Sequence, residues 1–270
     1  MLARNQKKFL KQIVVANCII SLFSASFVQA QSLEEKGLSI AKESDVRDTG
    51  WGDSEAKLKM VLRNKAGKES SREIRIKYLE IQTDGDKSIS IFDKPADVRG
   101  TTFLSHTHVA DPDDQWLYLP AIKRVKRISS ANKSGPFMGS EFSYEDFSSQ
   151  EVEKYTHKFI SDETVAGRDV FKVEQAPTYA KSGYVRRFIW IDKEHYYPIK
   201  IEFYDRKNAL LKTLEFSDYQ QYLDKYWRAG TMKMQNHQNG KSTDLVWEDY
   251  QFQIGLEDSD FSQAALKRSR

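Results

Sequence analysis

Short runs in which apolar and polar side chains alternate fill most of this chain. Residues 74–78 alternate isoleucine or tyrosine with basic residues, and residues 199–204 repeat the pattern after Pro198. Such alternation places every second side chain on the same face of a β-strand. Asn239-Gly240 predicts a two-residue hairpin turn. About eleven strands are predicted, at 57–64, 74–78, 88–91, 101–109, 114–119, 169–175, 184–192, 199–204, 210–219, 226–235 and 242–254.

Few helical patterns interrupt these strands. A helix is predicted over Gln31–Arg47, because Ser32 can cap its start and Glu35 follows three residues later, as in a capping box. A second, short helix is predicted at Ser140–Phe147. Strands without intervening helices favour antiparallel pairing. We therefore expect a mainly β (α+β) fold, a single curved antiparallel sheet or open barrel that no linker or repeat divides.

Several strands carry apolar residues on both faces. In residues 184–192 the pattern places Val185, Ile189 and Ile191 on one face, and Tyr184, Phe188 and Trp190 on the other. A sheet with one face in water does not show this composition. Either a helix covers the second face or that face lines an apolar cavity, and the sequence leaves both options open.

The first thirty residues have the three zones of a secretory signal peptide. Four basic residues precede an apolar stretch from Ile13 to Phe27, and Val28-Gln29-Ala30 ends it. A retained membrane anchor would need a longer apolar run, and a lipoprotein signal would need a small residue before Cys18 in place of Asn17. We predict that residues 1–30 are removed between Ala30 and Gln31, and that residues 31–270 form a single periplasmic domain.

Removal of this leader changes the charge and the cysteine content. The net charge falls from +3 for the whole chain to −1 for residues 31–270, since the leader holds four basic residues and no acidic ones. Cys18 is the only cysteine, so the remaining domain has no thiol and no disulfide. This balance gives no indication of a nucleic-acid partner.

Motifs of nucleophilic catalysis are absent from the sequence, but two features have chemical alternatives. His106 and His108, followed by an acidic turn, could hold zinc or could simply end a strand. A basic run with Lys123, Arg124, Lys126 and Arg127 has no acid within it. The run could be an edge strand guarded by cations, or it could attract lipid headgroups or an acidic partner surface.

Four ordered blocks of sequence resemble one known family. They are residues 97–104 (DVRGTTFL), 114–120 (DQWLYLP), 123–128 (KRVKRI) and 137–146 (FMGSEFSYED), together with Gly50-Trp51-Gly52-Asp53 near the start. They resemble the outer-membrane lipoprotein-sorting protein family, periplasmic relatives of the lipoprotein carrier LolA. The resemblance implies an unclosed half-barrel like those of LolA and LolB, with short helices over a concave apolar face. It also implies a transporter of the resistance–nodulation–division (RND) type as partner.

The function predicted from this resemblance is that of a periplasmic carrier without catalytic activity or cofactor. Such a carrier would bind the acyl chains of a lipoprotein or another envelope lipid and touch membranes only transiently. Because each buried methylene contributes about 0.8 kcal/mol, an apolar lining lowers the barrier to crossing water. The alternatives are an adaptor without cargo that docks through the basic run, and a metal-dependent hydrolase that uses His106 and His108.

Candidate residues follow for each role. The predicted lipid-binding residues are Phe103, Leu104, Trp116 and Tyr118, with Phe137 and Met138 near an entrance. The predicted docking residues for a partner or a headgroup are Lys123, Arg124, Lys126 and Arg127.

Overall fold

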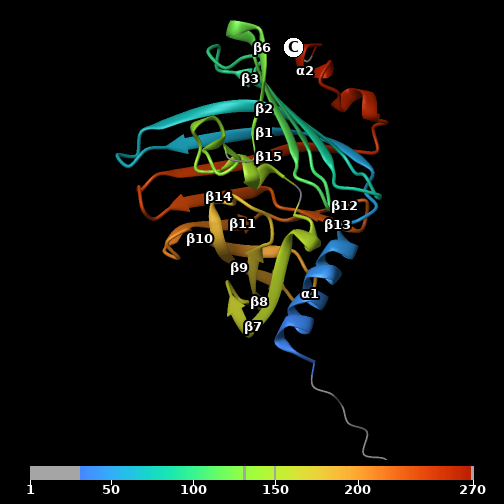
Figure 1. Ribbon diagram of the computed structural model, residues 1–270, viewed down its shortest axis with the longest axis vertical. Helices are drawn as coiled ribbons and strands as arrows, with labels where there is room; N and C mark the ends of the chain where they lie inside the picture. Colours follow the sequence, from blue (N-terminus) through green and yellow to red (C-terminus); the bar gives the residue numbers. More distant parts are fainter. Residues whose placement is uncertain (1–30, 130–131, 149, 269–270) are drawn as a thin grey trace, which may run out of the picture. The chain divides into compact units, whose positions relative to one another are not determined.

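The computed structural model describes residues 31–129, 132–148 and 150–268, and one antiparallel sheet dominates it (Figure 1). From Ser32 onward the described chain forms one compact unit. The predicted signal peptide, residues 1–30, lies outside the described residues, so cleavage between Ala30 and Gln31 stays a prediction. Within the described part of the chain, no helix is long and apolar enough to cross a membrane.

Thirteen strands form the sheet, in the order β6-β5-β4-β3-β2-β1-β15-β14-β11-β10-β9-β8-β7. Their bounds are β1 (Asp53–Arg63), β2 (Glu69–Leu79), β3 (Lys87–Lys94), β4 (Thr102–His106), β5 (Asp114–Leu119), β6 (Arg124–Arg127), β7 (Tyr155–Val165), β8 (Arg168–Pro177), β9 (Tyr184–Asp192), β10 (Pro198–Asp205), β11 (Leu210–Ser217), β14 (Thr231–Asn236) and β15 (Ser242–Phe252). A separate hairpin joins β12 (Gln220–Tyr222) to β13 (Tyr226–Arg228).

The sheet is curved but does not close, because β6 and β7 lie at its two ends and do not pair with each other (Figure 1). The prediction of a mainly β protein with a single unclosed antiparallel sheet is confirmed. Within this sheet, two strands go beyond the eleven that alternation predicts. One is β6, and an edge strand was one of the alternatives given for the basic run. The other is β7, whose outward positions are mostly polar. Outside the sheet, β12 was not predicted, and the predicted strand 226–235 is divided between β13 in the hairpin and β14 in the sheet.

Helix α1 (Leu33–Arg47) begins as the sequence predicts. Ser32 Oγ accepts a hydrogen bond from the Glu35 backbone N–H, and the Glu35 side chain accepts one from the Ser32 backbone. The helix packs against β7, where Ile40 meets Phe159 and Val173. The second predicted helix, Ser140–Phe147, is instead the 3₁₀ turn η4 (Tyr144–Phe147) preceded by η3 (Phe137–Gly139).

Two local expectations differ from the structure. Asn239-Gly240 does lie between β14 and β15, but the connection is longer than a two-residue turn, and the Asn236 N–H donates to the Lys241 carbonyl at 2.9 Å. A β-bulge between the Tyr204–Arg186 and Asp205–Tyr184 pairs shifts the alternation of β9. Because of this extra residue, Tyr184 joins the face opposite to that of Phe188 and Trp190.

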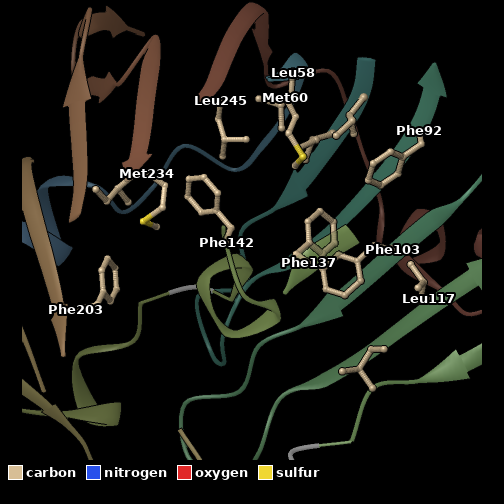
Figure 2. Close-up of a cluster of buried hydrophobic side chains, with 14 of the residues drawn as sticks. Leu58, Met60, Phe92, Phe103, Leu117, Phe137, Phe142, Phe203, Met234 and Leu245 are labelled. Carbon is tan, nitrogen blue, oxygen red and sulfur yellow. The ribbon is translucent and has the colours of Figure 1, made fainter. Parts of the chain in front are cut away.

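Both faces of the sheet carry buried apolar clusters. The inner face holds the largest one, which includes Leu58 and Met60 from β1 and Phe103 from β4 (Figure 2). On the outer face, Ile89, Ile91 and Leu104 are covered by the C-terminal segment, which contains η6 (Asp258–Phe261) and α2 (Ala265–Arg268). The remaining 3₁₀ turns are η1 (Pro120–Ile122) and η5 (Val152–Lys154).

Candidate functional site

Residues 132–148, here called the inner segment, lie across the inner face of the sheet. The Phe137 ring packs edge-on against Phe103 with ring centroids 5.1 Å apart, and Phe142 points toward Met234 and Leu245 (Figure 2). The backbone of the segment turns back on itself, since the Phe137 N–H donates to the Phe142 carbonyl at 2.7 Å. These aromatic anchors fix the inner segment over the centre of the sheet.

A buried ion pair ties the inner segment to the sheet. Lys212 Nζ on β11 lies 2.7 Å from Asp146 Oδ2 and 2.9 Å from the Glu141 carbonyl oxygen. The side chains of Lys212 and Asp146 are 4% and 8% exposed. The Tyr184 hydroxyl donates to Asp146 Oδ1 at 2.9 Å. Since both charges are shielded from water, the pair holds η4 in one position over β11.

The neighbouring Glu145 makes a second tie. Its carboxylate accepts hydrogen bonds from the Gly183 N–H and the Ser182 hydroxyl, both at 2.9 Å, and from the Tyr179 hydroxyl at 3.2 Å. Burial, and then the charge of Asp146, raise the pKa of this carboxyl above its ordinary value. The inner segment is thus anchored to the β8–β9 connection as well as to β11.

Beside the inner segment, the inner face is hollow. A cavity of about 1150 Å³ lies between the sheet, α1, η4 and η5. Its floor consists mainly of apolar side chains from β9, β10, β11, β14 and β15. The apolar floor residues are Ile189, Ile191, Ile201, Phe203, Leu214, Phe216, Met232, Leu245 and Trp247.

A row of polar side chains borders this apolar floor. His157, Gln175 and Arg187 are directly paired across β7, β8 and β9, and all three are buried. Gln175 Oε1 accepts from Arg187 Nε at 2.7 Å, while Gln175 Nε2 donates to His157 Nδ1 at 3.1 Å. The imidazole Nε2 lies 2.8 Å from the Val152 carbonyl, so Nε2 carries the proton. Burial, and then the charge of Arg187, lower the pKa of His157.

One end of the cavity is lined by carboxylates. Asp45 and Asp48 come from the end of α1, Asp86 from the β2–β3 turn, and Glu151 from the start of η5. Burial, followed by the charge of Asp86, raises the pKa of Glu151 to about 7. This end therefore holds a carboxyl group that changes its charge near neutral pH.

The structure divides the six predicted lipid-binding residues between the two faces. Phe103, Phe137 and Met138 meet in the inner cluster. Leu104, Trp116 and Tyr118 belong to the outer cluster, because adjacent residues of a strand point to opposite faces. All six lie outside the wall of the large cavity, whose floor comes from later strands. The sequence feature that pointed toward the cavity floor was the presence of apolar residues on both faces of the strand 184–192.

The four predicted docking residues lie together at one corner of the sheet. Lys123 ends η1 with a positive φ of 52°, and Arg124, Lys126 and Arg127 belong to the edge strand β6. Arg127 pairs with Asp114. Lys123 and Tyr118 also line a smaller cavity of about 410 Å³, which Arg99 and Pro120 help to enclose.

The two histidines considered for metal binding have separate partners. His106 Nε2 lies 2.7 Å from the Phe261 carbonyl oxygen, and burial lowers the pKa of His106. His108 Nδ1 lies 2.6 Å from Asp84 Oδ2. Among the described residues, no cluster of three or more His, Cys, Asp or Glu side chains is suited to hold a metal ion. Both histidine rings therefore make hydrogen bonds to other parts of the same fold.

Comparison with known proteins places this architecture among related structures. A family model described as an uncharacterized protein matches residues 84–268. A Vibrio parahaemolyticus domain, proposed to be an outer membrane lipoprotein-sorting protein, is 61% identical with a TM-score of 0.86, and the match covers 87% of this chain and all of that one. A DUF1329 family protein from Desulfovibrio piger is 29% identical with a TM-score of 0.82, over 87% and 99% of the two chains.

A more distant structure shares the fold. A LolA superfamily protein from Nitrosomonas europaea has a TM-score of 0.68 at 19% identity, over 85% of this chain and 98% of its own. No curated protein matches the chain significantly.

Proposed function

This chain belongs to the outer-membrane lipoprotein-sorting protein family of LolA-like proteins, and we propose that it is a periplasmic carrier of acyl chains. The cargo is a lipoprotein or another envelope lipid, taken up in the cavity on the inner face and moved between membranes. The carrier acts by binding and release, without a chemical step or cofactor. It touches membranes transiently and works with an inner-membrane RND-type transporter.

The cavity of about 1150 Å³ is the observation that carries this proposal. Ligand pockets are typically a few hundred to about 1,000 Å³, with apolar walls and a few polar groups that fix orientation. An acyl chain on the apolar floor would be removed from water, at about 0.8 kcal/mol per methylene. The anchored inner segment borders the cavity, since Phe142 and Phe147 are among its lining residues.

Native mass spectrometry of the protein recovered from the periplasm without detergent tests the carrier function. We expect a bound mass that matches an envelope lipid, and a protein mass that starts at Gln31. Protein that carries no lipid, and that still binds none after incubation with envelope lipids, would contradict the proposal.

A matched pair of variants on β14 locates the binding site. Met232 lines the cavity and Lys233, the next residue, is exposed. Met232→Trp should weaken lipid binding by about tenfold or more, because the larger side chain takes up space that about two methylenes of an acyl chain would fill, at about 0.8 kcal/mol per methylene. Lys233→Trp should bind as the wild type does. Equal binding by both variants would place the lipid elsewhere.

The basic corner supports a second candidate function, that of an adaptor which docks on a transporter and carries no cargo. Among the described residues, Lys123, Arg124 and Lys126 have no carboxylate partner within ion-pair distance. Such cations attract an acidic partner surface or lipid headgroups. Charge reversal of Lys123, Arg124 and Lys126 should abolish partner capture and leave lipid binding unchanged. If the reversed variant still captures the transporter, the adaptor function is wrong.

A further inference from the structure

Within the part of the chain that the structure describes, Arg187 is a buried cation without an anionic partner. Its residue is 6% exposed, and no carboxylate of the described residues lies within ion-pair distance of its guanidinium. Two other buried cations of the inner face are paired, Lys212 with Asp146 at 2.7 Å and Lys133 of the inner segment with Asp113 at 3.2 Å. Arg186, which precedes Arg187 in the chain and lies on the outer face, forms an ion pair with Glu174, with Nη1 and Oε1 3.5 Å apart. Arg187 therefore differs from the charged groups around it.

The contacts of Arg187 with described residues are all to neutral groups. Nε donates to Gln175 Oε1 at 2.7 Å, Nη1 donates to Gln150 Oε1, and the guanidinium stacks 3.9 Å from the centroid of the Tyr155 ring. Gln175 in turn holds His157 in its neutral form through its amide N–H. Burying a charge with only dipoles around it is costly unless an anion completes the site.

The position of Arg187 relates this charge to the apolar floor. Across the strands, Arg187 pairs with Gln175 on β8 and with Phe203 on β10. Two residues further along, Ile189 pairs with Ile201, which pairs with Leu214 on β11. All of these side chains line the large cavity. A polar row with one unpaired cation thus borders an apolar row on the same wall.

From this arrangement we propose that the cavity selects an amphiphile with an anionic headgroup, whose carboxylate or phosphate is bound by Arg187 while its alkyl tail lies along Ile189, Ile201 and Leu214. The inference rests on the proposed carrier function and names the class of its cargo. A guanidinium suits either anion, since it presents N–H donors in a planar fork. Gln175 accepts from Nε and Gln150 accepts from Nη1, so Nη2 has no hydrogen-bond partner among the described residues.

Calorimetric titration of the delipidated protein with three ligands of equal chain length tests this selection. Dodecanoate and dodecyl phosphate carry anionic heads at a pH of about 8, and dodecanol is neutral. We expect at least one anion to bind about tenfold or more tightly than dodecanol, because charge-assisted hydrogen bonds replace neutral ones. The preferred anion identifies the headgroup chemistry. Equal affinities for all three ligands would overturn the inference and leave the carrier function standing, whereas no binding of any of them would count against the carrier function itself.

Consecutive arginines supply a matched control. Arg187→Gln should lose the preference for the anion while keeping its affinity for dodecanol, and Arg187→Lys should retain part of the preference. Arg186→Gln, which changes the same charge on the outer face, should bind all three ligands as the wild type does. A preference that persists in folded Arg187→Gln would overturn the assignment. The comparison of ligands on the wild type stands even if that variant does not fold.

Discussion

At the scale of single residues, buried charges position the parts of this protein that surround the cavity. Lys212 and Asp146 bring the inner segment to β11, and Glu145 brings it to the β8–β9 connection. These groups are held by specific hydrogen bonds, so each removal leaves a partner without its counter-charge or donor. The consequences are measurable one residue at a time.

The Lys212–Asp146 pair should show strong coupling. Lys212→Met leaves Asp146 as an unpaired buried carboxylate, which typically lowers the free energy of unfolding by about 3–5 kcal/mol. Adding Asp146→Asn should recover a substantial part of this loss. Urea denaturation of the two single variants and the double variant measures the coupling, and additive losses would show that the two side chains act independently.

Glu151 should make stability depend on pH. Its pKa is raised from 4.5 to about 7 in the folded protein, so the folded state holds a proton that the unfolded state releases. The contribution to stability is complete below a pH of about 4.5 and is lost as the pH rises through about 7.

Comparison with Glu151→Gln isolates the contribution of Glu151 to the pH dependence of stability. The difference in unfolding free energy between wild type and variant should be constant below a pH of about 4.5, and it should shift in favour of the variant between pH values of about 4.5 and 7. Thermal or urea unfolding over this range measures it. A difference that does not change with pH would show that Glu151 titrates as it does in the unfolded chain.

At the scale of elements, α1 reaches its place because a glycine lets two backbones meet. A Cβ on Gly37 would lie 2.6 Å from the Phe159 backbone nitrogen and 2.8 Å from the Lys158 carbonyl carbon. Neither is the end of a flexible side chain, so the helix would have to move away from β7. Ile40, one turn later, fills the contact with Phe159 and Val173.

Gly37→Ala should therefore destabilise the protein although alanine favours helices. The helix preference gains about 1 kcal/mol, whereas the clash costs on the order of 1–3 kcal/mol. We expect a net loss of stability and weaker lipid binding, because α1 borders the cavity. Lys42→Ala, on the exposed side of the same helix, should have little effect. A stabilised Gly37→Ala protein would show that α1 is not closely packed on β7.

At the scale of the whole described molecule, the two faces of the sheet have different tasks. The outer face is closed over β3, β4 and β5 by the C-terminal segment, where Phe261 and Leu266 are fully buried. The inner face is only partly filled, and the unfilled part is the cavity. Stability and ligand binding should therefore be separable by face.

Phe261→Ala tests that separation. Loss of a fully buried phenylalanine typically costs about 3–5 kcal/mol, and the affinity for a lipid ligand should not change, because Phe261 lies on the face away from the cavity. The nearby Ile254, which is 41% exposed, should tolerate alanine with little loss. Chemical denaturation and calorimetric titration of both variants measure the two quantities, and a parallel fall in affinity would show that the faces are coupled.

The class of fold and the start of α1 follow from the amino-acid sequence alone, because strand alternation and a capping box are local patterns. The sequence predicted an unclosed antiparallel sheet, and the structure confirms it. Local patterns also explain what was missed. The outward side of β7 is polar and gives weak alternation, and the bulge in β9 moves Tyr184 to the other face, since one extra residue inverts a pattern of period two.

Which apolar residues pack together and which line the cavity depends on contacts between distant parts of the chain. Phe103 and Ile201 look alike in sequence, as apolar residues in alternating strands, yet Phe103 packs against the Phe137 ring of the inner segment while Ile201 lines the cavity wall. The same holds for Arg186 and Arg187, adjacent residues of which one meets Glu174 and the other meets only neutral partners. The physical reason is that alternation fixes the face on which a side chain lies, whereas its neighbours come from strands and segments far away in the chain.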